Sequence, residues 1–180
     1  MFLKTTMPKF ALSICLYRYD SSMIQRIQTV WLFLASVTLF ALFLFPYLQY
    51  ADLGGIGKAL KVTGVYHGVE GQAVRSEFFI GQTLATVLLG LFPLYIIVKF
   101  RQRKQQVQLI VLEIVLLLLF GVWLYVSASS ALTEARQFLS ARNIGVGFFL
   151  LPVSIVFLGM AMGAIRKDEK LVKSADRLRG

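Results

Sequence analysis

Four long apolar segments dominate the pattern of hydrophobic and polar positions along the chain. Residues 29–48, 78–98 and 144–165 contain no charged side chain, and residues 107–127 contain one, Glu113. About 20 apolar residues in a helix cross the bilayer core, which is roughly 30 Å thick. Strands of a membrane barrel are shorter and alternate between apolar and polar residues. The pattern therefore predicts an all-α membrane protein, a four-transmembrane-helix bundle with these four spans.

The connections between the spans carry weaker patterns. Residues 59–66 place β-branched and aromatic residues between glycines, which favours a short strand or hairpin in the first loop. Residues 99–106 form a short link, which predicts that the second and third spans make an antiparallel helical hairpin. Residues 128–143 have apolar positions at helical spacing, and these fit either a short interfacial helix or an extension of the third span.

The segment before the first span is expected to differ from the rest. Residues 1–22 hold one short apolar stretch, but no small-x-small motif for signal cleavage follows it. We expect this segment to be a disordered extension, an interfacial segment or the product of a misassigned start, because Met23 directly precedes the sequence that leads into the first span. The membrane domain is then 23–180.

The distribution of positive charge predicts the orientation. The chain has 19 Lys and Arg against 9 Asp and Glu; 14 of the basic residues lie before the first span, in the second loop and in the tail, and 5 in the other two loops. The positive-inside rule therefore places both termini in the cytoplasm and the first and third loops outside. This bias explains the net charge without nucleic acid, so we expect none as a partner.

The tail, residues 166–180, reads as an amphipathic helix. It has six basic residues, and four apolar side chains lie on one face. This composition suits the anionic lipids of a cytoplasmic membrane surface. A solvated helix that extends the fourth span explains the same pattern.

Glu113 is the candidate site, because it is the only ionisable residue inside a span. It shares a helical stripe with Gln102, Gln106 and Leu109, if the helix begins before the membrane, and lies in the inner half of the membrane. A structural role is favoured, with a basic neighbour such as Arg26 or Arg101 locking the helices together. The alternative is a small transporter or ion-handling protein that uses this carboxylate.

Small residues mark places where helices are expected to pack. Gly159 and Gly163 form a GxxxG motif in the fourth span, and Gly90 lies on a small, polar face of the second. The partner of the GxxxG motif is more often another helix of the same chain than a second subunit, although a homo-oligomer is possible.

Signatures of enzymes and of metal sites are missing from the sequence. It contains no His-Glu-x-x-His, no Gly-x-Ser-x-Gly and no phosphate-binding glycine loop. Cys15 and His67 are the only residues of their kinds, so no cysteine pair exists and we expect no metal or other cofactor. We therefore predict a non-enzymatic interaction, scaffold or accessory protein that docks an unknown protein partner. The expected cytoplasmic interaction face comprises Gln25, Arg26, Gln28, Arg101, Arg103, Lys170 and Arg177.

The two ends of the membrane domain resemble a known family. The chain reads MIQRIQT from Met23 and RKDEKLVKSADRLR from Arg166. These stretches are similar to the domain-of-unknown-function (DUF) family 4293, small four-span inner-membrane proteins of Bacteroidota. The resemblance covers about residues 23–179, and the family pattern has no counterpart of residues 1–22. It implies a bacterial inner-membrane location and supplies no activity, cofactor or catalytic residue.

Overall fold

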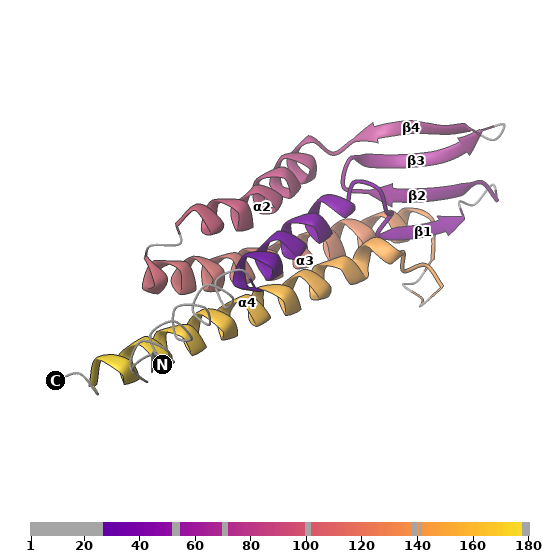
Figure 1. Cartoon of the computed structure of the whole chain (residues 1–180). Coiled ribbons are helices and arrows are strands. Elements are labelled where there is room, and N and C mark those ends of the chain that lie inside the picture. The colour runs from indigo at the N-terminus through magenta and orange to yellow at the C-terminus, as the bar shows by residue number, and fades with distance from the viewer. Residues whose placement is uncertain are drawn as a thin grey trace, which may run out of the picture.

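The computed structural model describes residues 27–51, 55–69, 72–99, 102–137, 140 and 142–177 (Figure 1). Four helices lie alongside one another, and a four-stranded antiparallel sheet continues from one end of them (Figure 1). The predicted N-terminal extension, 1–22, lies outside the described residues. In chain order the elements are the first helix Ile27–Ala41, β1 Leu48–Ala51, β2 Gly57–Lys61, β3 Gly64–Val69, β4 Gln72–Phe78, α2 Ile80–Val98, α3 Arg103–Glu134 and α4 Val146–Arg177.

Three of the four helices, α2, α3 and α4, are long and apolar enough to cross a membrane. Both α3 and α4 have 32 residues, which corresponds to about 48 Å at 1.5 Å per residue. Their outer faces are apolar: the side chains of Leu118 and Leu119 are 56% and 62% exposed. Water disfavours such a surface and lipid does not, so the chain is a membrane protein.

The ends of α3 and α4 decide between alternatives that the sequence left open. Residues 128–134 belong to α3, so the third helix extends beyond the predicted span and no separate interfacial helix forms there. The tail continues α4 without a break as far as Arg177, which makes it an extension of the fourth helix.

The first span is shorter than the sequence predicted. We expected a helix over 29–48, but it ends at Ala41. The last turn tightens, with the Phe43 amide donating to the Phe40 carbonyl at 3.1 Å, and Pro46 provides no amide proton to continue a helix. One apolar run therefore contains a helix, a turn and the start of a buried strand, and apolarity alone does not separate them.

The sheet is larger than the predicted hairpin. β2 and β3 pair as that hairpin, with Ala59 opposite Tyr66 and Leu60 opposite Val65. β1 and β4 add one strand on each side, in the order β1-β2-β3-β4. Neither added strand has a clear alternating pattern. β1 begins at the last residue of the first apolar run, and residues 74–78 of β4 are all exposed.

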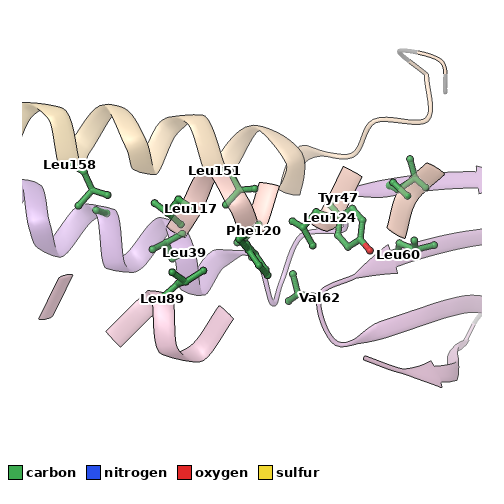
Figure 2. Close-up of a cluster of buried hydrophobic side chains, with 14 of the residues drawn as sticks. Leu39, Tyr47, Leu60, Val62, Leu89, Leu117, Phe120, Leu124, Leu151 and Leu158 are labelled. Carbon is green, nitrogen blue, oxygen red and sulfur yellow. The ribbon is translucent and has the colours of Figure 1, made fainter. Parts of the chain in front are cut away.

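A single core joins the helices to the sheet. Figure 2 shows buried side chains of all four helices in a row that continues to Val62, Tyr47 and Leu60, where the helices meet the sheet. The helices and the sheet therefore bury one continuous apolar surface, and the sheet is held in a fixed position at the end of the bundle.

The α3–α4 connection covers one edge of the sheet. Leu48 of β1 makes an antiparallel bridge with Ile144, and the Gln49 amide donates to the Asn143 carbonyl at 2.7 Å. Farther along, Gln137 Nε2 donates to the Ala51 carbonyl at 2.7 Å. At the other edge, no strand in the described part of the chain pairs with the outer side of β4.

Candidate functional site

A buried stripe on α3 carries the polar residues that the sequence selected. Gln106, Ile110, Glu113 and Leu117 are all buried, at spacings of four, three and four residues. This spacing turns one face of a helix toward its neighbours. Gln102, which we expected on the same stripe, is exposed.

Two glutamines link three helices at the end of the bundle away from the sheet. Gln28 Nε2 donates to Gln106 Oε1 at 3.0 Å, and Gln106 Nε2 donates to the Ile96 carbonyl at 3.0 Å. Gln106 is 1% exposed, so both bonds are shielded from water. The glutamines before the first span suggested amide hydrogen bonds either to the 99–106 link or to the tail. Gln28 bonds to the link, and Gln25 lies outside the described residues.

An ion pair closes the same end of the bundle. Arg103 Nη1 lies 2.9 Å from Asp168 Oδ2, which joins α3 to α4. Asp168 is buried, and sequence reasoning missed it as a site residue. A signal was present, because Ala161, Ile165 and Asp168 lie at spacings of four and three and are all buried, so this acid follows the apolar stripe of α4.

A cavity of about 160 Å³ opens between these groups. Its wall offers amide and guanidinium donors and a carboxylate acceptor, a set that suits water or a small polar group. It is lined by Gln28, Thr29, Leu32, Ile97, Arg103, Gln106 and Asp168.

Glu113 does not belong to that cavity. It is completely buried, and neither carboxylate oxygen has a hydrogen-bond partner among the residues that the structure describes. It lies seven residues beyond Gln106, about 10 Å along the helix, and Arg103 is ten residues away and paired with Asp168. A carboxyl group buried there is either protonated and neutral, or ionised and paired with a cation or another group outside the described residues.

The predicted interaction face divides into two groups. Gln28 and Arg103 face inward and are engaged in the contacts above, while Lys170 is exposed near the end of α4. The remaining predicted members have side chains outside the described part of the chain: Gln25, Arg26, Arg101 and Arg177. Arg26 and Arg101 are also the two cations expected to anchor Glu113.

The three selected glycines have different surroundings. Gly90 faces the ring of Phe40, whose Cζ would lie 3.0 Å from an added Cβ, and its carbonyl accepts a hydrogen bond from Ser36 Oγ at 2.7 Å. The first helix and α2 therefore approach closely. At Gly159 and Gly163, no described atom lies within 4 Å of an added Cβ, so no internal partner of the GxxxG motif is found among these residues.

A second polar cluster lies where the helices meet the sheet. Tyr47 Oη donates to Gln82 Oε1 at 3.5 Å, and Gln82 Nε2 donates to Ser127 Oγ at 2.7 Å. Burial raises the pKa of the Tyr47 phenol above its ordinary range, and the hydrogen bond to Gln82 offsets only part of that rise. The network ties the turn before β1 to α2 and α3.

The fold and its two polar clusters define the class as a small helical membrane protein with an antiparallel sheet at one end of the bundle. The chain belongs to the family described as domain of unknown function (DUF4293), whose sequence profile matches residues 24–178. The family resemblance seen at the two ends of the domain is thus confirmed. No curated protein matches the sequence.

Proposed function

We propose that this chain is an integral protein of the bacterial inner membrane that crosses it four times, with both termini in the cytoplasm. It acts without catalysis, as an interaction, scaffold or accessory protein. The sheet then lies on the outer side of the membrane, and the Arg103–Asp168 end of the bundle lies inside.

The spacing of the two polar clusters supports the four crossings. Gln106 belongs to the inner cluster and Ser127 to the outer one, 21 residues apart on α3. That separation is about 32 Å, close to the thickness of the hydrocarbon core. The first helix begins at the inner cluster, where Gln28 bonds to Gln106. The chain that follows this helix reaches the outer cluster at Tyr47. The segment from Gln28 to Tyr47 therefore spans the same distance as the part of α3 from Gln106 to Ser127.

The observation that carries the interaction role is the partly open sheet. It projects beyond the helices as a structured surface (Figure 1), and only its β1 edge is covered by the described chain. A sheet of this kind offers backbone groups and exposed side chains to another protein. At the inner end, Gln28 and Arg103 are already engaged in contacts within the chain.

Cysteine labelling tests the orientation. In a Cys15→Ser background, which removes the one native thiol, we expect Ile56→Cys to react with a membrane-impermeant maleimide in intact spheroplasts. Lys170→Cys should react only after the membrane is permeabilised. Both side chains are exposed, so burial does not limit either reaction. The reverse pattern, or labelling of both from one side, would contradict the proposed topology.

Glu113 supports a second candidate function, ion handling. The observation that favours it is a buried carboxylate without a described partner. Against it, buried Ile110 and Leu117 lie on the same stripe on either side of Glu113 and place apolar side chains along any route to it.

Flux measurements separate the two functions. If the chain is an interaction protein, liposomes that contain it should show no more proton or sodium flux than empty liposomes, under a pH gradient or a membrane potential. A flux that Glu113→Gln abolishes and Gln82→Leu, a variant of a buried amide far from Glu113, leaves unchanged would establish the second function instead.

A further inference from the structure

The outer edge of β4 has the features of a docking site for an extended chain. β4 runs from Gln72 to Phe78 and pairs with β3 on one side only, among the residues that the structure describes. Residues 74–78 are all exposed, with Val74 and Phe78 at 46% and 57%. The strand has no proline to protect the edge, although it carries two charged residues, Arg75 and Glu77, and a register shift against β3 at Ser76. By contrast, the β1 edge is covered by the α3–α4 connection.

We propose that the β4 edge binds an extended segment of another protein as a fifth strand. The inference rests on the proposed function, because it requires the sheet to lie outside the membrane. Unpaired backbone amides and carbonyls along an edge specify an extended peptide, because only a strand can form hydrogen bonds with these groups one after another along the edge. The occupant is therefore a strand rather than a helix or a small molecule.

The side chains of β4 specify the chemistry of that strand. Val74 offers an apolar position. Arg75 and Glu77 offer two charges of opposite sign on either side of the register shift at Ser76, and the Arg75 guanidinium lies 3.7 Å from the centroid of the Phe78 ring. Residues directly opposite in neighbouring strands interact, and opposite charges stabilise the pair. The bound segment should therefore alternate, with an apolar residue opposite Val74, an acid opposite Arg75 and a base opposite Glu77.

The direction of the bound strand follows from the rest of the sheet. All the neighbouring strands are antiparallel, so we expect the fifth strand to run antiparallel to β4 as well. β4 ends at Phe78, directly before α2, and therefore runs toward the membrane. The bound segment then runs away from the membrane, as a chain does when it leaves a transmembrane helix on the outer side.

A second copy of this chain does not meet these requirements. The strands lie roughly along the direction of the helices (Figure 1). A two-fold pairing of two antiparallel β4 strands would therefore place the two helical bundles in opposite orientations. Copies in one membrane share one orientation, so the occupant belongs to a different protein.

Photo-crosslinking in cells tests the proposal. The full chain is expressed in the bacterium that makes it, with a benzophenone amino acid in place of Val74, Ser76 or Phe78, one at a time. We expect each position to link to the same short segment of one outer-side protein. Because the strands are antiparallel, the linked residue should move back by about two positions each time the benzophenone moves forward by two.

Charge reversal adds an independent readout. Arg75→Glu should lower the crosslinking yield from position 74 by about threefold to tenfold, because an acid opposite it becomes a like charge. The matched control is Arg142→Glu, an exposed arginine in the α3–α4 connection, which should leave the yield unchanged. Thermal unfolding midpoints equal to that of the native chain show that the variants are folded.

Each other result overturns the proposal in an identifiable way. Links to residues three and four apart would show a helical partner, and links to another copy of this chain would show self-association. Links from Ile56 to an outer-side protein, with none from β4, would remove the β4 site and leave the interaction role standing. No protein link from Ile56 or from any β4 position would remove both.

Discussion

Gly145→Ala is expected to lower the free energy of unfolding by about 3 kcal/mol or more. A methyl group at this position would overlap the Pro46 carbonyl and lie 3.1 Å from the Tyr47 carbonyl carbon. Both are backbone atoms, so no side chain can turn away, and the Gly145 amide would lose its 3.0 Å hydrogen bond to the Tyr47 carbonyl. The measurement is thermal unfolding of the detergent-solubilised protein, followed by tryptophan fluorescence.

Gly163→Ala is the matched control for this prediction. No described atom lies within 4 Å of its added methyl group, and alanine is the better helix former by about 1 kcal/mol. We expect a midpoint equal to or above that of the native chain. Equal losses at both positions would show that Gly145 is not a special contact between the bundle and the sheet.

Glu113→Leu is expected to stabilise the protein, with a gain of about 1–3 kcal/mol. The carboxylate is fully buried and has no partner among the described residues, whereas leucine of similar size requires none. Gln106→Leu on the same buried face should have the opposite effect. It would leave the Gln28 amide buried without its partner and the Ile96 carbonyl with the Lys99 amide as its remaining donor, at a cost of about 1–3 kcal/mol.

The two variants together decide the role of Glu113. A loss of stability in Glu113→Leu would show that a cation anchors the carboxylate, as the sequence led us to expect of Arg26 or Arg101. In that case, replacing the anchoring arginine by glutamine should produce a similar loss, and the double variant should lose less than the sum.

The helices were the part of the fold that sequence predicted well, because their signal is local. An uncharged run of about 20 residues rarely forms anything other than a helix. α2 follows its run closely, and α3 and α4 cover nearly all of theirs but extend beyond them. The prediction of the first helix was wrong at its C-terminal end. Pro46 lies five residues beyond Ala41 inside the same apolar run, and the sequence does not show that the strand begins there as well.

The sheet was only half predicted, because its two outer strands lack a clear local signal. The β2–β3 hairpin follows from glycines and β-branched residues in one short segment. β1 pairs with β2 and is also covered by Asn143 and Ile144, almost 100 residues away. No local pattern encodes that second contact, and only Leu48, the first residue of β1, lay inside the predicted first span.

The site residues follow the same division. Spacing along one helix selected Gln106 and Glu113, and both lie on the buried face. The contact between Gln28 and Gln106 joins residues 78 positions apart, and the ion pair between Arg103 and Asp168 joins residues 65 positions apart. Such pairs depend on how the helices are arranged, and one sequence gives no direct signal of that arrangement.

The covered β1 edge also has a consequence for synthesis. β2, β3 and β4 pair with neighbours in sequence and can form as soon as they emerge, but the segment that closes β1 is made only after α3. A nascent or truncated chain that stops before residue 143 therefore exposes both edges of the sheet. The β1 edge is therefore the part of the sheet that differs between an unfinished copy and a finished one, because the outer side of β4 is unpaired in both among the described residues.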